Sequence, residues 1–95
     1  MFTASARLTY YIPHSFSLKD KRQVRRSLVD RARHKFNASI AEVGTQDVQQ
    51  TLTIGVSVVS GSAAHAQAYL EDIVRHMRDH ADAELTSTEM SIGKM

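Results

Sequence analysis

The chain has 95 residues, of which 42% are hydrophobic and 23% charged, with a net charge of +2 and no cysteine. This length suits one domain that buries roughly 60–65% of the surface of its unfolded chain, and the composition is that of a folded globular protein. The lack of cysteine excludes disulfides, thiolate metal sites and a cysteine nucleophile. No apolar run approaches the roughly 20 residues of a membrane span, and no secretory signal is visible. We therefore expect a cytoplasmic protein with no membrane contact.

The N-terminal third of the chain predicts a strand followed by a helix. Residues 2–12 alternate between apolar and polar side chains, which is typical of a strand with one buried face. Pro13 disfavours further pairing, and Ser17 followed by Asp20 predicts the start of a helix that runs to about Phe36. At 100° per residue this helix has an apolar arc. The arc holds Val24, Leu28, Val29, Ala32 and Phe36.

This first helix also concentrates the positive charge, because eight of the twelve Lys and Arg residues lie in it. Cations in the first turns of a helix cost roughly 0.3–1 kcal/mol each before screening, since the helix dipole is positive there. A tolerated cost indicates an anionic partner, and clustered cations release counterions when they bind nucleic acid. We therefore predict a phosphate-binding surface, with a solvated helix face as the alternative. The predicted nucleic-acid contacts are Lys19, Lys21, Arg22, Arg25, Arg26 and Arg33, of which four (Lys19, Arg22, Arg26 and Arg33) share an arc of about 60°.

The rest of the chain predicts two strands, a second helix and a last strand, in that order. The expected ranges are 37–43, 52–58, 63–81 and 83–92, with a turn at 44–47 and frayed residues at 93–95. The first and third strands alternate most cleanly, whereas the other two carry Glu42, Glu84 and Glu89, as edge strands often do. The order β-α-β-β-α-β predicts a ferredoxin-like α+β fold. Such a fold has a four-stranded antiparallel sheet with both helices on one face.

The sheet face without helices is expected to carry small and hydroxyl side chains. Only Tyr11 could stack on a base there, so an RRM-like platform is not expected. Such a flat face suits packing against a second copy of the chain. The alternative function is therefore a homodimer whose paired sheets enclose a small-molecule pocket that could be catalytic. The predicted dimer or pocket residues are Thr9, Tyr11, Thr53 and Ser57.

Other polar groups have simpler interpretations. Asp72, His76 and His80 share one side of the second helix and could hold a metal geometrically, but weak surface pairs are the more common arrangement, and no H-E-x-x-H motif is present. Glu42 and Asp47 flank the turn and could act as paired carboxylates, although an Asp in a turn more often bonds its own backbone. No phosphate-binding loop or dinucleotide fingerprint is present. We predict no catalytic residue, no metal and no cofactor.

Four segments carry a resemblance to a known family. They are SLKDKR at the start of the first helix, FNASIAEV into the second strand, TQD in the turn and TLTIGVSVVS in the third strand. With these segments the chain resembles, over nearly all its length, the YlxP-like family of small bacterial proteins of unknown function. The resemblance implies a ferredoxin-like fold and, through the family's gene neighbourhood beside translation and ribosome-maturation factors, a link to RNA or the ribosome. It implies no catalytic residues. The chain departs from the family at Val48 and Gln49, where members often carry an aromatic residue.

Our first hypothesis is therefore a non-enzymatic module that binds RNA or a ribosomal particle through its basic first helix. The homodimer with a small-molecule pocket is the second, and a protein-interaction adaptor is the third. The surface that is left free distinguishes the first two. The basic helix face serves RNA binding, and the open sheet face serves the pocket.

Overall fold

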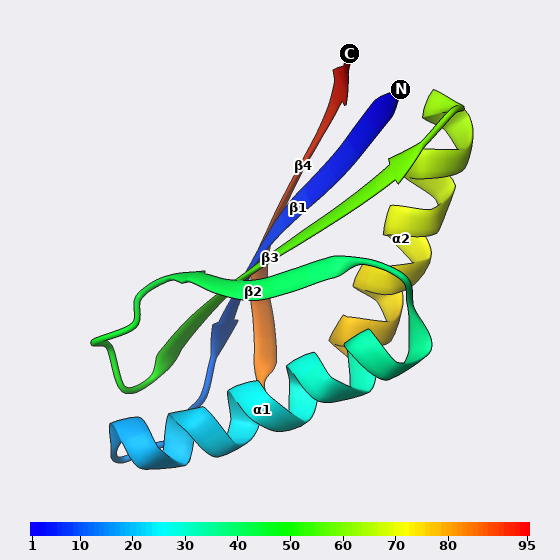
Figure 1. The fold of residues 1–95 in the computed structure, drawn as a ribbon. Helices are drawn as coiled ribbons and strands as arrows, with labels where there is room; N and C mark the ends of the chain where they lie inside the picture. Colours follow the sequence, from blue (N-terminus) through cyan, green and yellow to red (C-terminus); the bar gives the residue numbers. More distant parts are fainter.

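The computed structural model describes residues 1–95 and has the element order β-α-β-β-α-β (Figure 1). The strands are β1 (Phe2–Tyr11), β2 (Ser39–Gly44), β3 (Thr51–Ser60) and β4 (Glu84–Lys94), and the helices are α1 (Leu18–Lys35) and α2 (Ala63–Asp79). All strand pairs are antiparallel, and the sheet order is β2-β3-β1-β4. The predicted ferredoxin-like fold is confirmed, with β1 and β3 at the centre of the sheet.

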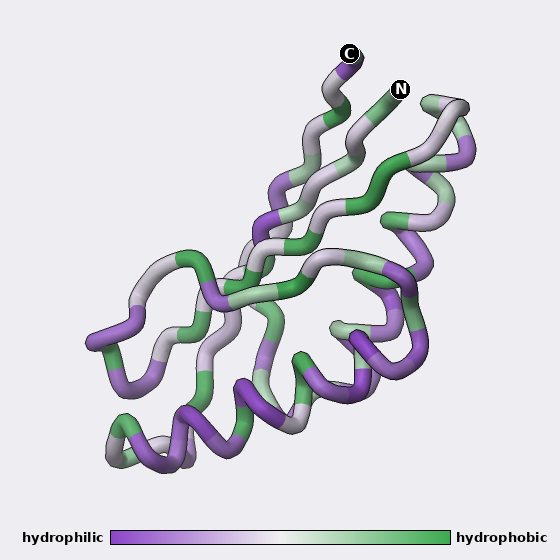
Figure 2. The backbone as a smooth tube through the Cα atoms, in the orientation of Figure 1, coloured by the Kyte–Doolittle hydropathy of each residue, from purple (hydrophilic) through white to green (hydrophobic).

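A single apolar core lies between the two helices and one face of the sheet. Alternate residues of the central strands are fully buried, for example Leu8 and Tyr10 of β1 and Ile54 of β3. Because α1 and α2 both contribute to this one cluster, they cover the same face. Figure 2 shows that α1 is mostly hydrophilic, with isolated apolar residues that recur along its length. Its apolar arc is buried while its remaining surface is charged.

Side-chain caps start both helices. The Ser17 hydroxyl accepts a hydrogen bond from the backbone N–H of Asp20 at 3.1 Å, and the Asp20 carboxylate accepts one from the backbone N–H of Phe16 at 3.1 Å. The first bond satisfies a donor that the first turn of a helix leaves free, and the second fixes the residue before the cap. Ser62 caps α2 by accepting from the N–H of His65 at 3.2 Å. The predicted helix start at Ser17 is confirmed.

The C-terminal end of the chain differs from the prediction. β4 extends to Lys94, and Met1 and Met95 exchange two backbone hydrogen bonds, at 2.9 and 2.8 Å. The expected fraying of residues 93–95 is therefore wrong, because the first residues of β1 supply a pairing partner for them. Neither helix combines the length and apolar character needed to cross a membrane.

Candidate nucleic-acid interface

A polar groove lies between α1 and the edge strand β2, and we call it the α1–β2 groove. It consists of two neighbouring hollows of about 430 and 140 Å³. Most of the residues that line them are polar or charged, because α1 turns several arginines toward this edge of the sheet. The polar side chains that line the groove include Arg22, Arg25, Arg26, Arg33, Glu42 and Gln46.

Four predicted contacts lie on the solvent side of α1, beside this groove. Lys19, Arg22, Arg26 and Arg33 are all exposed, as their common helical arc predicts. None of the first three takes part in an ion pair. Arg33 is engaged on one side, because its Nη2 donates to the backbone oxygen of Ile40 in β2 at 2.5 Å. The free positive charge is therefore greatest in the first half of α1.

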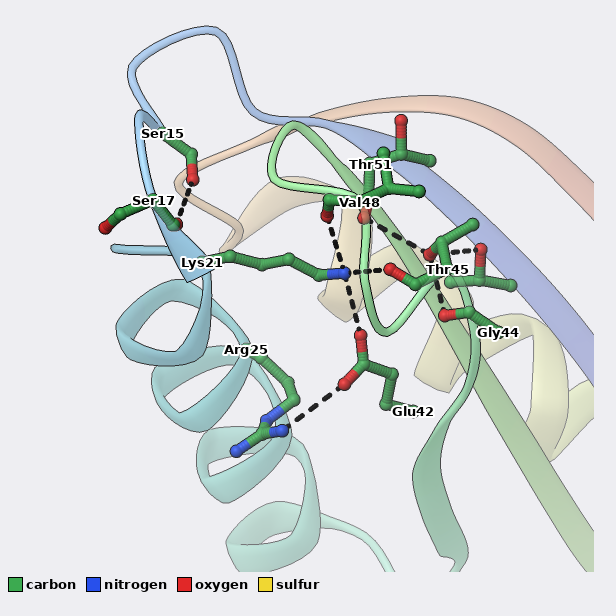
Figure 3. Close-up of polar contacts among 10 residues, drawn as sticks. Ser15, Ser17, Lys21, Arg25, Glu42, Gly44, Thr45, Val48 and Thr51 are labelled. Carbon is green, nitrogen blue, oxygen red and sulfur yellow. Dashed lines mark hydrogen bonds and ion pairs between the residues drawn. The ribbon is translucent and has the colours of Figure 1, made fainter. Parts of the chain in front are cut away.

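Lys21 lies inside the protein, with only 3% of its side chain exposed. Its Nζ atom is 3.1 Å from Glu42 Oε2 and donates to the backbone oxygens of Val48, at 2.9 Å, and of Thr45 (Figure 3). A buried ammonium cannot reach a phosphate, so the prediction of Lys21 as a nucleic-acid contact is wrong. The helical spacing explains the error, because Lys21 precedes the buried Val24 by three residues and thus shares its face.

Glu42 joins this lysine to Arg25, the remaining predicted contact. The Glu42 side chain is only 10% exposed, and its Oε1 lies 3.3 Å from Nη1 of the half-buried Arg25 (Figure 3). Glu42 follows the buried Ile40 by two residues, so both side chains face the helices. We call Lys21, Glu42 and Arg25 the buried ion cluster. Sequence reasoning missed it, although the shared faces with Val24 and Ile40 were visible signals.

The cluster changes the interpretation of two groups. Glu42 neutralises cations of α1 and is not half of a carboxylate pair, while Asp47 is exposed in the loop between β2 and β3. Glu42 offsets one of the two positive charges of Lys21 and Arg25, so the floor of the α1–β2 groove is less positive than its rim. The positive rim is formed by Lys19, Arg22 and Arg26.

The four predicted pocket residues lie on the helix-free face but do not form one site. Thr9 and Thr53 are direct cross-strand partners, and Tyr11 is exposed at the end of β1. Thr53 is buried because the loop after β2 covers it, and its hydroxyl lies 3.1 Å from that of Thr45. Ser57 lies four residues further along β3. Thr53 is therefore unavailable to a ligand or to a second copy of the chain.

An open hollow of about 500 Å³ lies on this face beside Ser57. The Ser57 hydroxyl is 3.0 Å from that of Ser5 on the neighbouring strand. Arg7 and Glu89 flank the hollow and form an ion pair at 2.8 Å. This hydrogen-bonded contact raises the pKa of Arg7 and lowers that of Glu89, so both are charged at neutral pH. The homodimeric pocket stays a prediction, and of its four predicted residues only Ser57 lines this hollow.

The histidines of α2 take part in helix packing. The rings of His76 and His80 stack with centroids 4.4 Å apart, and His76 meets the edge of Phe36 at 5.3 Å. Asp72 pairs with Arg75 at 2.9 Å. Burial and the neighbouring His80 lower the pKa of His76. These contacts hold the end of α2 against the segment that follows α1.

The fold and this surface define a small ferredoxin-like α+β domain with an arginine-lined groove at one edge of its sheet. Residues 3–90 match the family described as "Protein of unknown function (DUF503)". The "Uncharacterized protein YlxP" of Bacillus subtilis (strain 168) is 35% identical over 72 residues, which cover 76% of this chain and 78% of that protein. The chain therefore belongs to the DUF503 family, as its resemblance to YlxP-like proteins predicts.

Proposed function

We propose that this protein is a non-enzymatic module that binds RNA or a ribosomal particle through α1. The observation that carries the proposal is the row of Lys19, Arg22 and Arg26, which are exposed and have no acidic partner within 4.0 Å. These cations contribute little to folding, because even a formed surface ion pair is worth only about 0–1 kcal/mol. They are free for charge-assisted hydrogen bonds to phosphates of a partner.

The length of the basic row suits a polyanion better than a single phosphate. Lys19 and Arg33 are fourteen residues apart in α1, which corresponds to about 21 Å along the helix axis at 1.5 Å per residue. Several consecutive phosphates fit along such a row, and their neutralisation releases counterions. Arg33 extends the row but also holds Ile40 of β2. We therefore assign the main phosphate contacts to the first half of the helix.

The proposed binding mode reads the shape of a nucleic acid and not its sequence. Phosphate contacts fix position and orientation, whereas sequence is read at base edges. Single-stranded RNA is often read by stacking on aromatic side chains, and the α1–β2 groove has none among its lining residues. The expected ligand is therefore a structured RNA presenting a phosphate backbone.

The test is the triple variant in which Lys19, Arg22 and Arg26 are changed to Gln. We expect weaker binding to a structured RNA or to ribosomal particles. The slope of log K against log salt should also become less steep, by roughly 0.7–0.9 for each phosphate that is no longer neutralised. Because like charges are removed from the start of α1, the melting temperature should stay equal or rise slightly. Fluorescence anisotropy over a salt series measures both the affinity and the slope.

A matched control removes the same charge elsewhere. The triple change of Lys35, Arg75 and Arg78 to Gln lies outside the α1–β2 groove and should leave affinity and salt slope nearly unchanged. Equal weakening by both triple variants would mean that only net charge matters, and the assigned surface would be wrong. Failure of the wild-type protein to bind RNA or ribosomal particles at low salt would end the proposal.

The hollow beside Ser57 supports a second proposal, a homodimer whose paired open faces enclose a small molecule. Val59 is exposed on this same face of β3, with 68% of its surface accessible. In such a dimer the change Val59→Lys would place a charge in the contact, and burial of an unpaired charge is strongly unfavourable. Dissociation of a dimer by this single change would support the second proposal.

A further inference from the structure

The edge strand β4 is uncovered along most of its length. All its residues are exposed apart from the half-buried Leu85. Met90 and Ile92 are 49% and 43% exposed, although their partners in β1, Ala6 and Ala4, are buried. Figure 1 shows the reason, because the C-terminal part of β4 is separated from α2 by β1 and β3. The helix layer therefore stops before it reaches these two apolar side chains.

The backbone of β4 has a free row of hydrogen-bonding groups. Met1 and Met95 exchange two backbone bonds, and the same register continues inward to Thr9 and Ser87. Antiparallel partners alternate between bonded and non-bonded pairs. The odd residues of this segment of β4 therefore bond to β1, and the even residues direct their N–H and C=O groups outward. The outward residues are Thr88, Met90, Ile92 and Lys94.

The other edge of the sheet is protected in ways that β4 is not. β2 has only six residues, and its register shifts between Glu42 and Gly44. The backbone oxygen of Ile40 also accepts a hydrogen bond from the Arg33 side chain. Short length, irregularity and a charged side chain across the edge are standard protection against strand addition. β4 has eleven residues and no proline, and its one register shift, at Thr9/Tyr10 of β1, leaves the stretch from Ser87 onward regular.

We propose that β4 pairs with β4 of a second copy of this chain and joins the two sheets into one antiparallel sheet. In a two-fold dimer the axis passes beside one residue of β4, which then lies opposite its own copy in the partner subunit. We place this axis at Ser91. Met90 then lies opposite Ile92 of the partner subunit. The four exposed apolar side chains meet on the helix-side face, and the outward backbone groups of Met90 and Ile92 find partners.

Charge supports this register. A pairing centred on Glu89 would place two carboxylates opposite each other, and like charges at opposed positions are destabilising. With the centre at Ser91, Glu89 lies opposite Gly93 and Lys94 lies opposite Thr88. No like charges then meet. The α1–β2 groove, at the opposite edge of the sheet, stays free in this dimer.

Amide hydrogen exchange of the wild-type protein tests the arrangement directly. The N–H of Ser91 bonds to β1 and is protected in a monomer or a dimer, whereas the N–H groups of Met90 and Ile92 have partners only when β4 is paired on its outer side. We expect protection of both at concentrations where sedimentation shows twice the monomer mass. On dilution to the monomer, protection of Met90 and Ile92 should be lost while that of Ser91 persists.

Two variants and a control complete the test. Ile92→Pro removes one outward N–H without touching a bond to β1, since proline is accepted where a strand faces solvent. Met90→Lys puts a charge into the proposed contact at a position already half exposed in one copy. Both should be monomeric with an unchanged circular dichroism spectrum. The matched change Val59→Lys, on the open sheet face, should leave the dimer intact.

Three results would overturn the proposal. The first is a wild-type protein that is monomeric up to its solubility limit. The second is a dimer that persists in both Ile92→Pro and Met90→Lys. The third is a dimer that Val59→Lys dissociates while the amide of Met90 exchanges rapidly, because this result would place the contact on the open sheet face.

Discussion

Lys21 shows how one buried cation organises the segments around it. Its ammonium donates to carbonyl oxygens of Thr45 and Val48 in the loop between β2 and β3, and it lies beside the carboxylate of Glu42. Removing charges from water costs several kcal/mol per ion, which a buried pair recovers only when its hydrogen bonds are complete. The ammonium has two carbonyl acceptors, and the carboxylate adds a charge contact at 3.1 Å in which Glu42 Oε2 accepts no hydrogen bond. Lys21 therefore holds the loop against α1 beside the groove.

At this scale we expect Lys21→Met to lower the free energy of unfolding by about 3 kcal/mol, because it removes the donor to the Val48 carbonyl and leaves Glu42 with Arg25 alone. The double variant Lys21→Met with Glu42→Leu should regain part of the loss, since it also removes a nearly buried carboxylate that would keep only Arg25 as a partner. Urea denaturation of the wild type, both single variants and the double variant measures this coupling. A Lys21→Met protein as stable as the wild type would show that Lys21 is not buried in solution.

Among the elements, β2 and β3 approach each other closely where Gly55 faces the helix-free side. Gly55 pairs with Ala41, and the side chain of Val43 leans over it, so that an added Cβ would lie 2.8 Å from Val43 Cγ1. This distance is too short for carbon atoms in contact. The side chain of Val43 therefore replaces the one that Gly55 lacks, and the two residues act as one unit of packing at this edge.

We accordingly expect Gly55→Ala to lower the free energy of unfolding by about 1 kcal/mol, because Val43 must move to make room. Val43→Ala alone should have a smaller effect, since this side chain is more than half exposed. Combined, the two changes should be less destabilising than the sum of the single changes. Thermal denaturation of the three variants tests this, and strictly additive effects would contradict the contact.

On the scale of the whole molecule, the two proposed surfaces lie at opposite edges of the sheet. The basic row of α1 stands beside β2, and the uncovered strand is β4. A dimer joined through β4 would carry its two basic rows at its outer ends. In the proposed arrangement, dimer formation and phosphate binding would therefore not compete for the same surface.

Independence of the two surfaces is itself testable. Ile92→Pro should bind a short structured RNA as tightly as the wild type, because substitutions far apart without shared partners act independently. The same variant should lose affinity for a long RNA that can engage both rows at once, since bivalent binding adds avidity. Gel-shift titrations with RNAs of two lengths measure this difference. Equal losses for short and long RNA would show that the surfaces are coupled.

Much of this architecture is predictable from local patterns. Apolar residues alternate in β1 and β3 and form an arc on each helix, which indicates the buried side of each element. The element order and the ferredoxin-like fold follow from these patterns. Ser17 and Asp20 likewise mark the start of α1, because a cap requires only neighbouring residues. The exposed positions of Lys19, Arg22 and Arg26 follow from the same helical period.

Other features depend on contacts between segments that are distant in the sequence, and only the tertiary structure decided them. Lys21 is buried because Glu42 and the carbonyls of the following loop meet it, and Thr53 is buried because Thr45 covers it. The exposure of β4 depends on where α2 crosses the sheet. The helical or strand period places a residue on one face of its own element. Which other segment packs against that face depends on the three-dimensional arrangement. For that reason the fold and the basic row were determined by the sequence alone, and the buried ion cluster and the free edge were not.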